Sequence, residues 1–398
     1  MNRVVITGIA PVNAMGSGNE FFNNLMAMRP VISKADNNYC AGKISSGWYV
    51  PYPEVDLAPY MDKLKRMPSL ASKNACTAAV AAIIAASDAG ISEFDPDTAV
   101  FFGVSTMNAD DVINAYNLIK GNRRLMPSTN PKAMANAVPA WISILFNVHG
   151  RSQVISTACS SGPDAVGAAY EHISMGKSKM AICGGADYMK SDEEMIFRSF
   201  DVLGALTRST DGLPRPFSDQ RSGFLFCEGG ACALILEEYE CALRRNADIY
   251  AEITGYDSCC DAYHIVKMPE YPQQAVAMLR KLTQGKKVDY YNAHGTATEV
   301  NDRIETIALK EVFGNDLKNV IINATKGITG HCIGTSGAIE AAVCAYSIRH
   351  GIVHGNIPGT PFEGLNLPDK TTKADIKCAV SSSFGFGGHN CALMFEKI

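Results

Sequence analysis

A strand–turn–helix unit that occurs twice in the chain places the strongest constraint on its fold. The first copy spans residues 154–178, VISTACSSGPDAVGAAYEHISMGKS, and the second spans residues 321–351, IINATKGITGHCIGTSGAIEAAVCAYSIRHG. Each copy sets a short loop of reactive residues between an apolar strand and a helix with small residues on every side. Such a helix packs closely all round. The two copies therefore predict two similar halves, each with a buried helix.

Short β-rich runs alternate with alanine-rich stretches in both halves, which predicts an α/β fold. Expected strands of the first half are residues 4–10, 99–105, 154–158, 180–186 and 231–236, with helices at 71–89 and 166–175. Those of the second half are 249–258, 288–295, 320–327, 377–388 and 390–396, with a helix at about 338–348. Several strands are apolar at every position, as in a sheet that helices cover on both faces.

The boundary between the halves is expected near residue 246, giving units of 1–246 and 247–398. No Ser/Gly-rich linker, charge run or low-complexity segment divides the sequence there, so we expect one continuous core. Residues 107–140 form an expected insertion with an Asn-, Arg- and Pro-rich middle. Such a segment suits a lid, a substrate wall or a subunit contact.

Charge and cysteine content narrow the possible partners and compartment. The 398 residues carry 36 Lys and Arg against 40 Asp and Glu, a formal net charge of −4, which argues against general binding to nucleic acid or anionic membranes. No apolar stretch is long enough to span a bilayer. The thirteen cysteines lie mostly singly in apolar runs without any C-x-x-C, so we expect buried thiols in a reducing cytoplasm and no zinc site.

Cys159 is the candidate nucleophile. It stands in S-T-A-C-S-S-G, between the strand and the helix of the first repeat, where a sharp turn would present it. The helix N-terminus is expected to lower the thiol pKa and to offer backbone N–H groups to an oxyanion. The alternative is one more buried cysteine, which is our interpretation of the other twelve.

Two histidines lie on loops at expected strand ends: His294 in Y-N-A-H-G-T-A-T and His331 in T-K-G-I-T-G-H. Loops of this kind gather at one edge of an α/β sheet, so both histidines can converge with the cysteine. Each histidine taken alone is more often structural, but the adjacent Gly295 and Gly330 permit a ligand to approach closely. Lys326, five residues before His331, is either a solvated lysine or a group that orients that histidine.

Glycine-rich loops of the chain do not match phosphate-binding motifs. Neither G-x-x-x-x-G-K-[ST] nor G-x-G-x-x-G after a first strand occurs, so no nucleotide cofactor is expected. Phe384 and Phe386 in S-F-G-F-G-G can stand at a pocket mouth, although aromatic residues near a strand end are more often core. The roles of the following His389 and of Cys227 stay open.

Taken together, T-A-C-S-S-G, N-A-H-G-T-A-T, T-K-G-I-T-G-H and S-F-G-F-G-G resemble the motifs of elongating β-ketoacyl-ACP synthases, the type II condensing enzymes of the thiolase superfamily. The stretch 215–230, RPFSDQRSGFLFCEGG, and the D-A-Y-H at 261–264 extend the resemblance over nearly the whole chain. It implies a five-layered αβαβα fold built from two βαβαβαββ halves. It also implies a Cys-His-His site that takes acyl groups from an acyl carrier protein and condenses them with malonyl units.

Motif matching carries the family's residue roles onto this sequence. Cys159 would accept the acyl group, and its backbone N–H with that of Phe386 would form an oxyanion hole. His294 and His331 would bind the malonyl thioester and promote decarboxylation. The resemblance further implies that Lys326 holds His331 with Glu340 behind it, that Phe386 acts as a gate beside Phe384, and that Thr296 and Thr298 contact the phosphopantetheine arm. No metal or nucleotide is implied.

The implied partners are an acyl carrier protein and a second ketosynthase-like subunit, identical or related. Lys63, Lys65 and Arg66 form a basic cluster where these synthases commonly dock the acidic carrier, although a solvated helix end would look the same. Departures from the family pattern at Cys227 and His389 favour a specialised polyketide or polyene pathway over housekeeping fatty-acid synthesis.

Two other functions compete with the condensing enzyme. A thiolase has a similar histidine loop but adds a second catalytic cysteine, whereas the nearest candidate here, Cys391, lies in an apolar strand. A subunit of the chain-length-factor type typically lacks the nucleophilic cysteine. Because Cys159, His294 and His331 are all present, a catalytic chain is favoured, alone or as the active half of a heterodimer.

Overall fold

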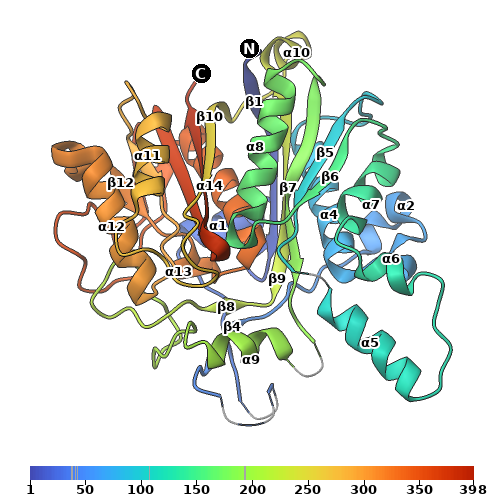
Figure 1. Cartoon of the computed structure of the whole chain (residues 1–398). Coiled ribbons are helices and arrows are strands. Elements are labelled where there is room, and N and C mark those ends of the chain that lie inside the picture. Colours follow the sequence, from blue (N-terminus) through green and yellow to red (C-terminus); the bar gives the residue numbers. More distant parts are fainter. Residues whose placement is uncertain (37–38, 41, 43, 107, 192–193) are drawn as a thin grey trace.

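Five strands from each half form a mixed sheet with the same strand order in both halves (Figure 1). The computed structural model describes residues 1–36, 39–40, 42, 44–106, 108–191 and 194–398, so Met107 of the expected insertion lies outside it. The first sheet has the order β6 (Ser152–Ile155), β5 (Ala99–Gly103), β7 (Met180–Tyr188), β9 (Gly229–Glu238) and β1 (Val4–Asn13). The second has the order β12 (Ile321–Asn323), β11 (Tyr290–Asn292), β15 (Cys378–Gly385), β16 (His389–Glu396) and β10 (Ala251–Cys260).

Strand directions repeat as well. In the first sheet β6, β5 and β7 are parallel, and β9 and β1 follow as antiparallel neighbours. In the second, β12, β11 and β15 are parallel, and β16 and β10 follow in the same way. The two sheets join where β1 pairs with β10 over Val4–Ile6. The prediction of two similar α/β halves is therefore confirmed.

Helices complete five layers. The two helices of the sequence repeat, α8 (Ser161–Ser174) and α14 (Ser336–His350), pack against each other and against strands of both sheets. The outer face of the first sheet is covered by α4 (Lys73–Asp88) and α7 (Ala137–Phe146), and that of the second by α11 (Gln273–Leu282) and α12 (Glu299–Phe313) (Figure 1). The αβαβα layering that the resemblance implied is thus confirmed.

Small residues allow the two central helices to meet. A Cβ atom on Gly162 of α8 would lie 2.5 Å from the carbonyl oxygen of Gly334, and one on Gly337 of α14 would lie 2.5 Å from Cδ of Pro163. Such separations leave no room for a side chain. Because both helices begin at this contact, the loops that precede them lie close together.

Smaller elements surround this core. They are β2 (Gly16–Ser17), β3 (Ser33–Lys34), β4 (Trp48–Val50), β8 (Phe226–Cys227), β13 (Ile352–Val353), β14 (Thr372–Lys373), α1 (Asn19–Met26), α2 (Met61–Leu64), α3 (Met67–Leu70), α9 (Met195–Val202), α10 (Tyr239–Arg244) and α13 (Lys326–Thr329). Between β5 and β6 the chain forms α5 (Ala109–Lys120) and α6 (Thr129–Ala133), and α5 projects from the body of the molecule (Figure 1). Within the described ranges, no helix has both the length and the apolar character to cross a bilayer.

Candidate active site

The structure brings Cys159, His294 and His331 together from three separate loops. Sγ of Cys159 and one ring nitrogen of each histidine all lie within 4.8 Å of one another, and Nε2 of His331 is 3.3 Å from Sγ of Cys159. The two imidazole rings lie edge to face, with centroids 5.5 Å apart. All three residues are at most 4% exposed. A thiol and two imidazoles therefore share one small, nearly dry volume.

A strained turn presents the cysteine. Cys159 lies in the 3-10 turn η2 (Ala158–Ser160) between β6 and α8, and Ala158 has a positive φ of 52°. The hydroxyl of Ser161 fixes this turn, because it accepts from the N–H of Thr157 at 2.9 Å and donates to the carbonyl of Ala158 at 2.7 Å. The end of β15 lies so close that a Cβ on Gly385 would come within 3.3 Å of the cysteine nitrogen. Backbone from both halves thus meets at Cys159.

The pKa of Cys159 differs from the sequence-based expectation. Burial raises the pKa of this thiol to about 11, against the lowering effect of the Lys326 charge and of hydrogen bonds from the backbone N–H groups of Phe386 and Cys159. The expected lowering at the helix N-terminus was therefore wrong for the resting protein, because removing the thiolate from water outweighs it. The two N–H groups nevertheless favour negative charge on the sulfur.

Both histidines are held neutral. Burial lowers the pKa of His294 and of His331 well below the ordinary value, and the positive charge of Lys326 lowers both further. Nδ1 of His331 lies 3.0 Å from Oγ of Ser336, while Nδ1 of His294 has no hydrogen-bond partner in the part of the chain that the structure describes. Neutral imidazoles can each donate one N–H to a substrate oxygen without adding a charge.

Lys326 and Glu340 form a buried ion pair beside the histidines. Nζ of Lys326 donates to Oε1 of Glu340 at 2.6 Å, and the side chains are 2% and 1% exposed. Burial raises the pKa of Glu340 to about 7, and Lys326 opposes this shift. The lysine acts on His331 through its charge, whereas the hydrogen bond to the ring comes from Ser336, which the sequence analysis did not single out.

Glu305 on α12 holds the loop of the other histidine and also escaped the sequence analysis. Its carboxylate accepts from the N–H of His294 at 2.8 Å and from that of Gly295 at 2.9 Å. The side chain is fully buried, and burial raises its pKa. Eleven residues separate Glu305 from His294 on a helix of mixed character, so no local motif signals this contact.

The remaining predicted residues lie at varied distances from the cluster. Phe384 packs edge to face on His294, with ring centroids 5.9 Å apart, and Phe386 stacks on Phe200 at 6.2 Å. The hydroxyls of Thr296 and Thr298 are 3.0 Å apart on the loop after His294, and Thr298 also caps α12. Of these residues, Phe384 is in ring contact with His294.

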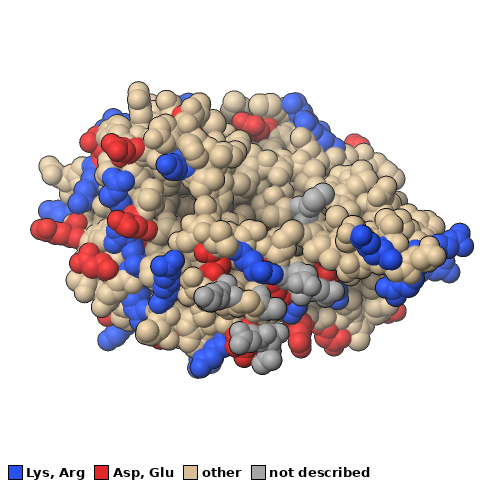
Figure 2. Space-filling model, turned by 60° about the horizontal axis from the view of Figure 1, so that its bottom comes forward, with Lys and Arg blue, Asp and Glu red and all other residues tan. Residues whose placement is uncertain are grey.

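Lys63, Lys65 and Arg66 lie at the surface, in and just after α2, and all three are exposed. Figure 2 shows a further gathering of Lys and Arg at the end of the molecule that α5 forms, where the exposed basic residues are Lys120, Arg123 and Arg124.

The two residues whose roles stayed open have defined surroundings. The carbonyl of His389 accepts from Oγ of Ser160, the residue after the nucleophile. Sγ of Cys227 lies 2.9 Å from Sγ of Cys332, the residue after His331. Both residues therefore touch the neighbours of the cluster.

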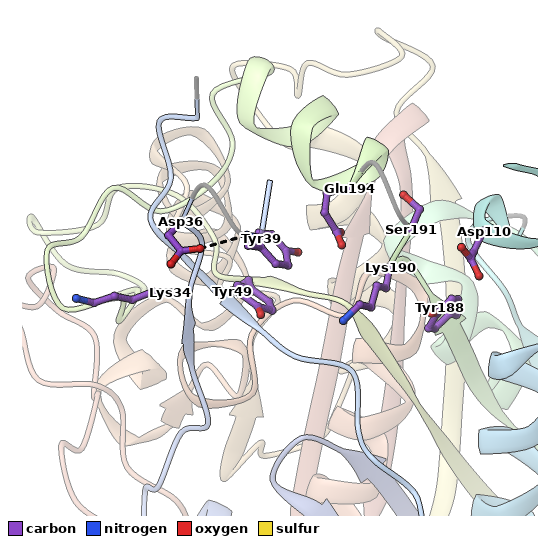
Figure 3. Close-up of a pocket in the computed structure, with 9 residues that line it drawn as sticks. All are labelled: Lys34, Asp36, Tyr39, Tyr49, Asp110, Tyr188, Lys190, Ser191 and Glu194. Atoms are coloured by element: carbon purple, nitrogen blue, oxygen red, sulfur yellow. Dashed lines mark hydrogen bonds between the residues drawn. The ribbon is translucent and has the colours of Figure 1, made fainter. Parts of the chain in front are cut away.

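A separate cavity of about 520 Å³ lies beside α9 and is lined by charged residues and tyrosines (Figure 3). Its lining residues are Lys34, Asp36, Tyr39, Tyr49, Asp110, Tyr188, Lys190, Ser191 and Glu194. The sequence-predicted site residues are not among them.

Family models match almost the whole chain. The β-ketoacyl synthase N-terminal domain matches residues 1–241, and the C-terminal domain matches residues 250–360. The chain belongs to the β-ketoacyl synthase family. The similarity that the active-site motifs indicated is therefore confirmed over both halves.

Individual relatives agree with this membership. The chain is 32% identical to 3-oxoacyl-[acyl-carrier-protein] synthase 1 of Escherichia coli (strain K12), over 100% of both chains. Its fold also matches the AntDE:AntF structure, in which a type II polyketide synthase acyl-carrier protein is in complex with its ketosynthase. The TM-score is 0.86 and the sequence identity 28%, over 100% of this chain and 99% of that one. It matches the ishigamide ketosynthase/chain length factor with a TM-score of 0.88 and 26% identity over 100% and 99%.

Proposed function

We propose that the protein is a β-ketoacyl-ACP synthase that transfers an acyl group from an acyl carrier protein to Cys159 and condenses it with malonyl carrier protein. The observation that carries this function is the buried contact of Sγ of Cys159 with Nε2 of His331, beside His294 and at the start of α8. A thiol, two neutral donors and two backbone N–H groups are the groups that a thioester condensation requires.

In the first step Sγ of Cys159 attacks the carbonyl carbon of the acyl thioester. The C–S bond to the carrier's phosphopantetheine breaks, and the departing thiolate takes up the proton that the cysteine thiol loses. The N–H groups of Phe386 and Cys159 are proposed to hold the oxyanion during the attack, since both lie beside the sulfur and lower its pKa. The products are acyl-Cys159 and free carrier thiol.

In the second step a malonyl thioester binds with its carbonyl oxygen near His294 and His331. Their N–H groups stabilise the enolate that forms as the carboxylate leaves as carbon dioxide. The enolate carbon attacks the acyl carbonyl, and the C–S bond to Cys159 breaks. One proton from solvent returns the thiolate to the thiol, which leaves a β-ketoacyl carrier protein.

Supporting roles follow from the same geometry. We assign Lys326 to keeping both histidines neutral, since its charge lowers the pKa of each ring, and Glu340 to holding Lys326 in place. Phe386 is proposed as a gate, supported by its stacking on Phe200, with Phe384 as a wall against His294. Thr296 and Thr298 are proposed contacts of the phosphopantetheine arm.

No metal or nucleotide has a step in this mechanism. Cys159, His294 and His331 would also suit a soft divalent cation by their spacing, but we assign them to acyl transfer because the chain belongs to the β-ketoacyl synthase family. We propose the cytoplasm as the place of action and residues 1–246 and 247–398 as the two ketosynthase halves.

The substrate pathway is proposed as specialised polyketide or polyene assembly, with fatty-acid synthesis as the alternative. Support comes from the similarity to the ketosynthase of a type II polyketide system. A thiolase-type acyltransferase is less well supported, because Cys391, fully buried in β16, lies outside the catalytic cluster.

A second ketosynthase-like subunit, identical or related, is the proposed partner. Strand β6 ends the first sheet and pairs only with β5 among the described residues, so its other edge is open to a strand from a second chain. The insertion 107–140 is proposed as part of the same contact. Mass photometry of this chain, alone and mixed with a candidate partner, distinguishes a homodimer from the active half of a heterodimer.

Carrier docking is proposed at Lys63, Lys65 and Arg66, whose exposure and charge suit an acidic protein. Charge reversal at Lys65 and Arg66 should raise the apparent KM for a carrier-bound substrate and spare a small acyl thioester. Reversal of Lys310, an exposed lysine on α12, serves as the matched control. Equal loss with both substrates would exclude this docking site.

Intact-mass measurement tests the function directly. The protein is mixed with a panel of acyl carrier proteins and then with malonyl carrier protein, beside Cys159→Ala. Cys260→Ala controls for labelling of an exposed thiol. We expect an acyl mass that needs Cys159 but not Cys260 and that leaves as a longer β-ketoacyl product. Absence of label with every primer, even with a candidate partner subunit, would favour a non-catalytic subunit.

A further inference from the structure

The proton of the neutral His331 ring can sit on either nitrogen, and its position decides what the ring does. Nε2 faces Sγ of Cys159 at 3.3 Å, and Nδ1 faces Oγ of Ser336 at 3.0 Å. A proton on Nε2 makes the ring a hydrogen-bond donor toward the sulfur and the substrate. A proton on Nδ1 would make Nε2 a base that takes the thiol proton instead.

Hydrogen-bond accounting at Ser336 distinguishes the two tautomers. The side chain is only 3% exposed, and its Oγ accepts from the backbone N–H of Cys332 at 2.8 Å. The hydroxyl has one hydrogen to give, and Nδ1 of His331 is the acceptor within reach among the described residues. If Nδ1 carried the ring proton, the serine oxygen would accept twice and its own buried hydrogen would have no acceptor.

We propose that Ser336 is a positioning residue that keeps the His331 proton on Nε2 by donating its hydroxyl hydrogen to Nδ1. The catalytic consequence rests on the proposed function: His331 then serves both steps as an N–H donor and does not act as the base for Cys159. The inference concerns His331 alone, because Nδ1 of His294 has no such partner among the described residues.

The surrounding backbone fixes Ser336 for this task. It is the first residue of α14, and the preceding Thr335 donates its N–H to Oδ2 of the buried Asp187 at 3.1 Å. The carboxylate of Asp187 also accepts from the N–H of Ser105 at 2.9 Å, which ties this turn to the first sheet. The hydroxyl is therefore held between Cys332 and His331.

Nitrogen NMR on the resting protein tests the tautomer without any turnover. The protein is labelled with ¹⁵N at histidine, and the His331 signals are assigned by their loss in His331→Gln. We expect Nε2 to carry the proton in the wild type, and Ser336→Ala to shift population toward Nδ1. Ser336→Thr, which keeps a hydroxyl, should retain the wild-type pattern.

Ser347→Ala is the matched control, because Ser347 is fully buried in the same helix and its hydroxyl has no hydrogen-bond partner among the described residues. It should leave the His331 signals unchanged. Wild-type protein with the proton on Nδ1, or Ser336→Ala with an unchanged pattern, would overturn the inference. If Ser336→Ala fails to fold, the wild-type and Ser336→Thr spectra still decide it.

Kinetics separate this inference from the proposed function. In Ser336→Ala the decarboxylation of malonyl carrier protein should slow roughly tenfold, the change expected when one tautomer loses a hydrogen bond of ordinary strength. Ser336→Thr should restore the rate. A wild-type protein that is never acylated at Cys159 would refute the function and leave the NMR result intact, whereas an active enzyme with Nδ1 protonated would refute only the role of Ser336.

Discussion

The buried pair of Lys326 and Glu340 allows a quantitative test of the electrostatics at the site. The side chain of Glu340 is only 1% exposed, and Lys326→Met would leave its carboxylate without a cation. Removing one partner of a buried pair costs about 3–5 kcal/mol. An unfolding entropy of about 2.1 cal/mol/K per residue gives about 0.8 kcal/mol/K for 398 residues, so we expect Tm to fall by about 4–6 °C.

The decrease in Tm caused by Lys326→Met should depend on pH. Burial raises the pKa of Glu340 to about 7 in the folded protein, against about 4.3 for an unfolded glutamate. The folded state therefore binds the proton more tightly, and stability declines as pH rises between these two values. Without Lys326 the folded pKa rises further. The Tm difference between Lys326→Met and wild type should therefore be larger at pH 8 than at pH 5, by up to about 1.4 kcal/mol or about 2 °C, because pH 8 lies about one unit above the wild-type pKa of Glu340.

Thermal unfolding from pH 5 to pH 8 measures this effect. Lys310→Met, at an exposed position on α12, controls for the loss of a lysine as such. Lys326→Met/Glu340→Leu removes both charges and should recover most of the lost Tm at pH 8. Equal Tm losses at pH 5 and pH 8, or a double variant as unstable as the sum of the single variants, would refute the reasoning.

Three further predictions concern the helix contact, the pKa of the thiol and the absence of a metal from the proposed mechanism. Gly162→Ala should lower Tm by several degrees, because the new Cβ would lie 2.5 Å from the carbonyl oxygen of Gly334. Gly47→Ala is the control, since the space around its Cβ is open, and it should leave Tm unchanged. Similar Tm values for the two variants would contradict the close helix contact. Burial raises the pKa of Cys159 to about 11, so the rate of its alkylation by iodoacetamide should still increase between pH 8 and pH 10. Peptide mass spectrometry measures this rate. A plateau near pH 8 would show a lower pKa. EDTA should leave the condensation rate unchanged, and a loss that added zinc restores would assign Cys159 to a metal site.

The sequence predicts those features of the fold and site that depend on residues close together in the chain. The strand–turn–helix repeat predicted where Cys159 and His331 would stand, because a loop between a buried strand and a buried helix has few positions to occupy. Ser336 and Glu305 reach their partners across turns that only the folded backbone defines, so no motif indicated them. The pKa of Cys159 depends on how much water the fold removes, and a helix N-terminus alone predicted the opposite shift.

The central place of β1 has a consequence for how the chain is made. This strand is buried along its whole length; β9 pairs with most of it and β10 with Val4–Ile6, and these two strands begin at Gly229 and Ala251. More than 200 residues must therefore be synthesised after β1 before either neighbour exists, which takes roughly 10–45 s at about 5–20 residues per second. During that interval an apolar strand with two open edges leaves the ribosome unpaired. Yield in a foreign host should accordingly depend on chaperones that bind β1 in the nascent chain.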